Sequence, residues 1–125
     1  MIYSIEQKTI LYFKKRSEHM VFNTGAALLD AIVLAVVSEE EEGTYGYKIT
    51  QDVRKAIEVS ESTLYPVLRR LQKDGFLYVY DRECGGRNRR YYQITDAGQV
   101  KLSEYRMEWE IYASKISALF AGEEL

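Results

Sequence analysis

The chain has 125 residues, with 17 Lys and Arg against 19 Asp and Glu and a formal net charge of −2. This length predicts one domain with its own core, and a hydrophobic content of 46% excludes a mainly disordered chain. One Cys and one His exclude a disulfide framework and a Cys/His zinc site, and we expect no cofactor or metal. Taken as a total, the negative charge argues against a nucleic-acid partner, because domains that bind DNA are usually basic.

The most apolar stretch, residues 26–37, is too short to span a bilayer, which needs about 20 apolar residues, and Asp30 interrupts it. A basic cluster at 14–16 precedes it, but no small-residue cleavage site follows. We therefore expect a cytoplasmic protein without membrane contact.

Residues 1–20 differ in character from the rest, and two interpretations stay open. They are a genuine N-terminal arm, or a translated leader ahead of a natural start at Met20. The leader is suggested by codons for the segment 15–19, which can spell a purine-rich ribosome-binding sequence at a normal distance from that start.

Two helices are predicted next. Residues from Asn23 to about Glu41 form a helix that is apolar on nearly every side, so two surfaces must cover it, and the second is either its own core or another subunit. Gly43 and Gly46 bracket a turn, and the apolar spacing over 47–57 predicts a second, short helix.

A third helix begins after Ser60, whose hydroxyl can cap it, and ends at Gly75. Pro66 lies inside it, so either Tyr65 sits in the first turn or the helix bends. Its apolar stripe consists of Leu64, Val67, Leu68 and Leu71.

A hairpin and a long helix complete the chain. Residues 76–80 read as a strand, 82–90 as a charged turn with a basic tip, and 91–94 as the returning strand. Thr95 caps the last helix, in which Asp96 suits the positive end of the dipole and which runs to about Ala121.

The last helix carries a heptad pattern, the apolar seam. The seam consists of Leu102, Tyr105, Trp109, Tyr112, Ile116 and Leu119. Such a seam either packs against a partner helix or folds back on its own domain. We favour the partner, because the first helix is already too apolar for one small domain to cover.

This order of elements is that of a winged helix-turn-helix, mainly α with a small antiparallel β-hairpin. We expect a DNA-binding domain over 21–95 and a dimerisation helix over 96–125. In this fold the third helix enters the major groove, and the hairpin lies against the DNA backbone or in the minor groove.

The predicted DNA contacts lie on two elements that the fold turns to one side. Base edges suit the side chains at the start of the third helix, which are Ser60, Glu61, Ser62, Thr63 and Tyr65. The basic residues of this helix suit phosphates or guanine, and the arginine-rich hairpin suits a narrow minor groove or its phosphates. Any one arginine alone is better read as solvated surface. The predicted set is Tyr45, Tyr47, Lys48, Ser60, Ser62, Thr63, Tyr65, Arg69, Arg70, Lys73, Gly86, Arg87, Asn88, Arg89 and Arg90.

Charge counted by segment supports this prediction. Residues 43–95 hold ten basic and six acidic side chains, giving +4, whereas residues 1–42 and 96–125 each carry −3. The basic part is the part predicted to contact DNA.

Two motifs resemble the PadR family of bacterial transcriptional regulators. The first is Ser62-Thr63-Leu64-Tyr65-Pro66-Val67-Leu68-Arg69-Arg70-Leu71, followed by Asp74-Gly75-Phe76-Leu77. The second is Gly85-Gly86-Arg87-Asn88-Arg89-Arg90-Tyr91-Tyr92-Gln93-Ile94-Thr95-Asp96-Ala97-Gly98. Tyr45-Gly46-Tyr47 is similar to the start of that family's second helix. The resemblance covers about Phe22 to Phe120.

The resemblance implies a homodimeric repressor that binds a pseudo-palindromic operator and is released by a ligand. The single short last helix is similar to a small subgroup, some of whose members sense planar hydrophobic drugs. There an aromatic residue at the dimer centre stacks on the ligand, and Trp109 matches it; packing alone is the other interpretation. The implied ligand and dimer residues are Phe22, Leu29, Leu102, Tyr105, Trp109, Tyr112, Ile116 and Leu119.

The sequence departs from the family pattern in its first twenty residues, in the acidic run Glu39–Glu42 and in Cys84. Cys84 is either a redox switch beside three arginines or a partly exposed thiol. We expect no enzyme, because His19 is the only histidine and no paired carboxylates, nucleophile elbow or phosphate loop occurs. The alternative function is a winged-helix module that binds another protein and senses no ligand.

Overall fold

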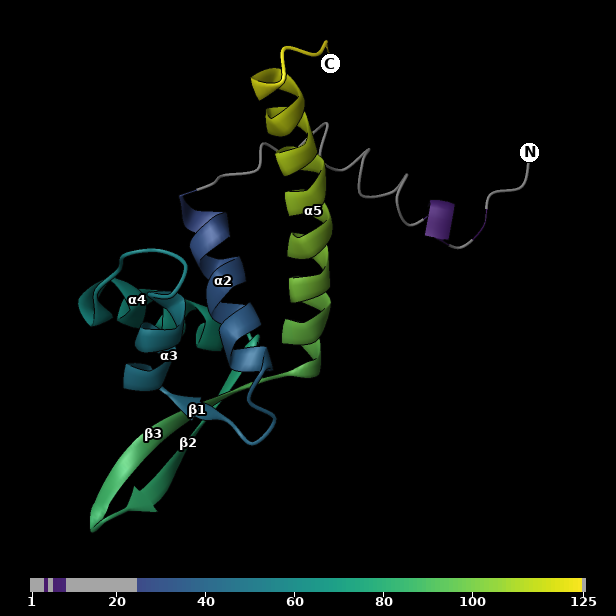
Figure 1. Ribbon diagram of the computed structural model, residues 1–125. Helices are drawn as coiled ribbons and strands as arrows, with labels where there is room; N and C mark the ends of the chain where they lie inside the picture. Colours follow the sequence, from purple (N-terminus) through teal and green to yellow (C-terminus); the bar gives the residue numbers. More distant parts are fainter. Residues whose placement is uncertain (1–3, 5, 9–24, 125) are drawn as a thin grey trace.

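The computed structural model describes residues 4, 6–8 and 25–124. The elements are α2 (Ala26–Ser38), β1 (Thr44–Tyr45), α3 (Gly46–Val53), α4 (Glu61–Lys73), β2 (Leu77–Cys84), β3 (Arg87–Ile94) and α5 (Asp96–Phe120). Figure 1 shows α3 and α4 on one side of α2, α5 on the other, and the β2–β3 hairpin reaching beyond the helices. The predicted arm or leader over 1–20 falls mostly outside the described residues, and Phe22 lies wholly outside them.

The core lies where the helices meet the base of the sheet. Helix α2 contributes Val33, Leu34 and Val37, all fully buried, and it contacts α5 as well as α3 and α4. The predicted stripe of α4 faces it, and the buried set is completed by Ile49, Val53, Leu77, Tyr92 and Leu102.

Two predicted helices are shorter in the structure. Helix α2 ends at Ser38 rather than near Glu41, and Gly43, with a φ of +96°, turns the chain into β1. Helix α3 begins at Gly46 and ends at Val53; irregular turns continue to Ile57, whose N–H donates to the Val53 carbonyl at 3.1 Å. The local apolar spacing continues through this segment although the regular helix does not.

Helix α4 has the predicted ends. Ser60 caps it, its hydroxyl accepting from the Thr63 N–H at 3.3 Å, and Gly75 follows with a φ of +80°. Pro66 lies beyond the first turn, so the Ser62 carbonyl receives no helical hydrogen bond from it. Tyr65 is therefore not in the first turn of the helix.

The prediction of a long charged turn in the hairpin is wrong. Strands β2 and β3 pair without a break from Leu77 opposite Ile94 to Cys84 opposite Arg87, leaving only Gly85 and Gly86 as the turn. Both glycines have positive φ, which two-residue hairpin turns require. The sheet has the order β1-β3-β2, and the two-residue β1 was not predicted.

Helix α5 is 25 residues long and ends at Phe120, one residue before the expected end. Thr95 caps it as predicted, accepting from the Gly98 N–H at 3.0 Å. The helix lies alongside α2 and its later turns extend past it (Figure 1). Within the described residues, no helix combines the length and the apolar character that crossing a membrane requires.

Candidate nucleic-acid interface

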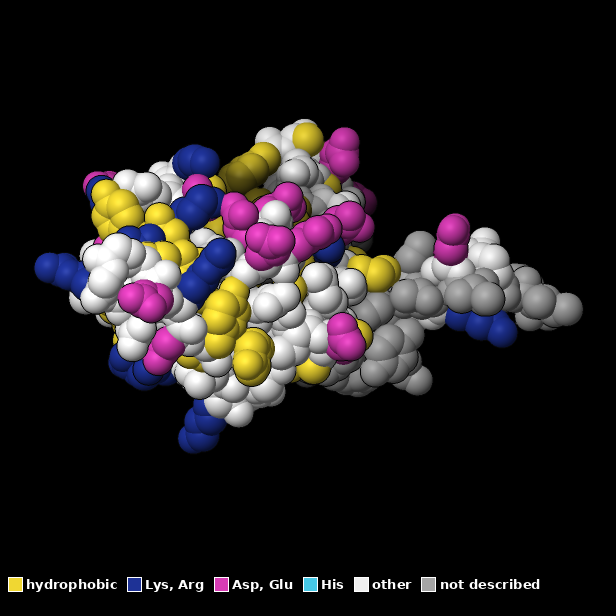
Figure 2. Space-filling view, turned by 90° about the horizontal axis from the view of Figure 1, so that it is seen from below, with side chains coloured by type: hydrophobic (Ala, Val, Ile, Leu, Met, Phe, Trp, Pro, Cys, Tyr) yellow, Lys and Arg dark blue, Asp and Glu magenta, His cyan; other side chains and the backbone are white. Residues whose placement is uncertain are grey.

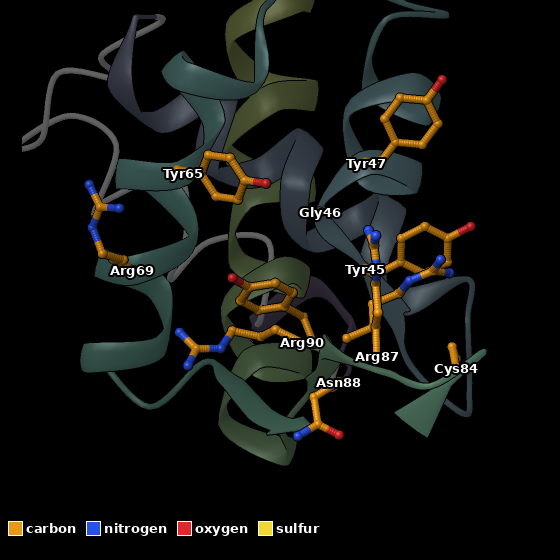
Figure 3. Close-up of a pocket in the computed structure, with 11 residues that line it drawn as sticks. Tyr45, Gly46, Tyr47, Tyr65, Arg69, Cys84, Arg87, Asn88 and Arg90 are labelled. Atoms are coloured by element: carbon orange, nitrogen blue, oxygen red, sulfur yellow. The ribbon is translucent and has the colours of Figure 1, made fainter. Parts of the chain in front are cut away.

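A cavity of about 710 Å³ lies between the start of α3, the middle of α4 and the hairpin; we call it the wing pocket. Figure 3 shows Tyr65 and Arg69 on α4 facing the β3 residues Arg87, Asn88 and Arg90 across it. The remaining lining residues are Tyr45, Gly46, Tyr47, Cys84, Arg89 and Tyr92. The folded chain thus gathers most of the predicted DNA-binding tyrosines and arginines around one concave surface.

Tyr65 is fixed against the start of α3. A Cβ atom at Gly46 would lie 3.2 Å from its ring, so only glycine allows this approach without adjustment. The Tyr65 hydroxyl donates to the Glu61 carboxylate at 3.2 Å, and its side chain is 40% exposed. Burial and Glu61 raise the pKa of Tyr65, so the phenol stays protonated and able to donate near neutral pH.

The hydroxyls at the start of α4 form a local network. The Ser60 Oγ lies 2.9 Å from Ser62 Oγ and 3.1 Å from Thr63 Oγ1. They lie outside the wing pocket; Ser60 and Thr63 line a second cavity of about 380 Å³ with Arg54. Ser60 therefore has a structural role as the cap, while Ser62 and Thr63 remain exposed.

The arginines of the hairpin alternate between its two faces, because neighbouring strand residues point in opposite directions. The Arg89 guanidinium lies over the Tyr45 ring, 4.2 Å from its centroid, and Arg90 lies 3.9 Å from the exposed Asp81 carboxylate. Among the described residues, Arg69 and Arg87 pair with no carboxylate. Their charges are therefore available to an anionic partner.

Two predicted DNA contacts are engaged elsewhere. Lys48 lies 2.5 Å from a Glu40 carboxylate oxygen and 3.2 Å from one of Asp52, and both hydrogen bonds raise its pKa. Arg70 forms an ion pair with Asp30 of α2. Both charges are thus largely neutralised within the fold, which sequence spacing did not reveal. Lys73 is exposed in the last turn of α4, and Gly86 is part of the hairpin turn.

The backbone of the acidic run Glu39–Glu42 is held against the sheet by two hydrogen bonds. The Gln93 amide donates to the Glu41 carbonyl at 2.7 Å, and the Tyr80 hydroxyl donates to the Glu42 carbonyl. Figure 2 shows a cluster of acidic side chains with Lys and Arg side chains beside it, and further acidic side chains elsewhere in the same view.

A second, apolar groove of about 180 Å³ runs between α2 and α5. It is lined by Leu28, Ala31, Ile32, Ala35, Leu102, Tyr105, Arg106 and Trp109. Leu102 is only 2% exposed and also belongs to the core, and Leu29 packs against that core. Trp109 is 43% and Leu119 55% exposed, while Tyr112 and Ile116 are partly buried. The first part of the seam folds back on its own domain and the later part stays open.

Comparisons with known proteins fit this architecture. A sequence profile described as the transcriptional regulator PadR-like family matches residues 33–104. The uncharacterized protein X of Lysinibacillus sphaericus is 35% identical over 102 residues, covering 77% of this chain and 91% of its own. The transcriptional regulator Rv3488 of Mycobacterium tuberculosis is 41% identical over 73 residues, covering 58% of this chain and 68% of its own.

Solved structures agree. A Streptococcus mutans protein superposes with a TM-score of 0.73 at 37% identity, over 85% of this chain and 98% of its own. A PadR-like transcriptional regulator of Bacillus cereus gives a TM-score of 0.68 at 31% identity, over 77% of this chain and 94% of its own. The chain belongs to the PadR-like family of transcriptional regulators, and it is a DNA-binding winged-helix regulator rather than an enzyme.

Proposed function

We propose that the protein is a homodimeric repressor that binds a pseudo-palindromic operator and is released by a planar aromatic ligand at the dimer interface. The wing pocket carries the DNA-contact part of this proposal. Tyr65, Arg69 and Arg87 come from two elements separated in sequence and surround one basic, concave surface. A duplex with its regularly spaced phosphates is the partner that such a surface fits.

In this arrangement α4 lies in the major groove and the hairpin follows the neighbouring backbone or minor groove. Ser62 and Thr63 are exposed at the front of α4 and read base edges, while the exposed Tyr65 ring contacts a thymine methyl. Arg69 and Arg87 neutralise phosphates. Lys48 and Arg70 are left out of the contact set, since each is already paired with a carboxylate.

The later turns of α5 form the proposed dimer contact, with 21–95 as the DNA-binding part and 96–125 as the dimerisation helix. Support comes from Trp109 and Leu119, which are about half exposed in the single chain, and from Phe120, which is 89% exposed. A two-fold axis through these helices would bury this apolar surface, and binding to a palindromic operator requires the two α4 helices to lie about one DNA turn apart.

The α2–α5 groove is the proposed ligand site. Its lining is almost wholly apolar, and Trp109 at its edge offers a flat face on which an aromatic ring can stack. A ligand that wedges between α2 and α5 changes their separation, and with it the spacing of the two α4 helices.

DNA binding is tested by fluorescence anisotropy with the duplex upstream of the protein's own gene. We expect affinity to fall steeply with salt, and Arg69→Ala and Arg87→Ala to weaken binding about tenfold each. Lys55→Ala, at a side chain that is 77% exposed and outside the wing pocket, removes the same charge and should change little. Unchanged affinity in both arginine variants would show that the contact assignment is wrong. Absence of salt-dependent binding would favour the protein-interaction module.

Dimerisation and ligand binding need separate measurements. Light scattering should give twice the chain mass, and a monomer would refute the dimer. An acridine dye should quench the fluorescence of Trp109, the single tryptophan, and displace the operator over the same concentrations. No quenching at high dye concentration means that Trp109 serves packing alone.

A further inference from the structure

We infer that Glu61 is a specificity-determining residue that accepts a hydrogen bond from the exocyclic amine of cytosine, and that Tyr65 positions it. This inference rests on the proposed entry of α4 into the major groove. It concerns the identity of one base pair in each half-site.

The charge of Glu61 is the first observation. Glu61 is the only acidic residue of α4, whose other charged residues are Arg69, Arg70 and Lys73. A carboxylate at the front of a helix that approaches phosphates weakens binding to every sequence through repulsion. A contact with a base-edge donor offsets this repulsion at one sequence and at no other.

The geometry of the carboxylate is the second observation. The Tyr65 hydroxyl donates to Glu61 Oε2 at 3.2 Å, and the Tyr65 ring is held against Gly46. One oxygen is thereby held beside Tyr65, which lines the wing pocket. In the described part of the chain, Oε1 accepts no side-chain hydrogen bond, so it remains available to an outside donor.

The chemistry of the base follows from the carboxylate. An ionised carboxylate only accepts hydrogen bonds, so its partner must be a donor. In the major groove the donors are the N4 amine of cytosine and the N6 amine of adenine. Adenine places the N7 acceptor beside its amine, which repels a carboxylate, whereas cytosine has no acceptor there. Cytosine is therefore the favoured base.

The test selects bound sequences from a random double-stranded DNA library with the full-length protein. Wild type should enrich a motif with one cytosine in each half-site that Glu61→Gln no longer selects, the preference falling about tenfold. Glu61→Gln should also bind non-specific DNA more tightly, because a negative charge is lost. Tyr65→Phe should weaken the same preference without adding one elsewhere, as expected of a positioning residue.

The control is Glu58→Gln, the same charge change at an exposed residue three positions before Glu61. It should raise non-specific affinity and keep the motif. The inference is refuted if Glu61→Gln, folded by its melting temperature, selects the wild-type motif with unchanged preference at every position. If wild type itself enriches no motif, sequence-specific binding fails, and the proposed function fails with it.

Discussion

The Asp30–Arg70 ion pair predicts an asymmetric response to mutation. The pair joins α2 to the last turn of α4; the Asp30 side chain is 12% exposed and that of Arg70 47%. Arg70→Met keeps the alkyl stem but leaves the Asp30 carboxylate buried without its partner. Asp30→Asn removes the buried charge and leaves a guanidinium that water already solvates.

The two losses differ in size. Removing one partner of a fully buried pair costs about 3–5 kcal/mol, and the half-exposed Arg70 reduces this to about 1–3 kcal/mol for Arg70→Met. Asp30→Asn should change the free energy of unfolding at pH 7 by less than about 1 kcal/mol, because it also removes the desolvation of a charge.

The pH dependence follows from the same burial. Burial raises the pKa of Asp30 above its ordinary value of 3.8, and the hydrogen bond and charge of Arg70 oppose this. A raised folded pKa stabilises the fold fully below about pH 3.8, and this contribution is lost as pH rises through the folded value. Without Arg70 the pKa rises further, so the loss in Arg70→Met should be small near pH 3.5 and grow toward pH 7.

Urea unfolding at fixed protein concentration, from pH 3.5 to 7, gives the free energy of unfolding of wild type, Arg70→Met and Asp30→Asn. Two results would refute the reasoning. One is an Asp30→Asn variant as unstable at pH 7 as Arg70→Met. The other is an Arg70→Met loss that does not shrink in acid.

Three further predictions concern single sites. Gly98→Ala places a Cβ atom 2.2 Å from the Phe76 carbonyl oxygen and should cost about 3 kcal/mol or more in unfolding free energy; a loss under about 1 kcal/mol contradicts the packing. Ser60→Ala removes the hydroxyl that accepts from the Thr63 N–H and should lower the free energy of unfolding by about 1 kcal/mol, measured by urea unfolding. An unchanged free energy would show that the cap is dispensable. Burial raises the pKa of Tyr105 to about 12, so protonation of this phenol stabilises the fold below pH 10, and that contribution is lost between pH 10 and 12. The free energy of unfolding of Tyr105→Phe should therefore change less with pH than that of wild type between pH 10 and 12. An equal change in both proteins would contradict this prediction.

The elements that were predicted correctly carry their signals locally. Helix α4 has a capping Ser60 before its apolar stripe and a positive-φ Gly75 after it, so its ends lie within reach of short sequence patterns. The hairpin was foreseen but its length was not. Arg82–Cys84 and Arg87–Arg90 have low strand propensity, and pairing across the Gly85-Gly86 turn outweighs that preference.

Long-range pairing explains what the sequence could not reveal at the site. The partner of Arg70 lies 40 residues away, and that of Lys48 lies eight residues away in the preceding acidic run. Spacing identified both as exposed basic side chains, but only the packing of α2 on α4 and α3 brings the carboxylates to them. The two-residue β1 is defined by its pairing with Tyr91 and Tyr92, which is also non-local.

The position of the acidic run changes how the net charge of −2 bears on DNA binding. Gln93 holds the Glu41 backbone, and it points to the sheet face opposite Tyr92, which lines the wing pocket. Repulsion between charges falls with distance, and 0.1 M salt screens it beyond about 10 Å. Acidic groups near the far face therefore oppose phosphates there more than at the pocket. A duplex that approaches this far face is repelled, and one that approaches Arg69 and Arg87 is attracted. With the DNA contacts proposed above, this distribution of charge favours approach of the duplex from the side of the pocket.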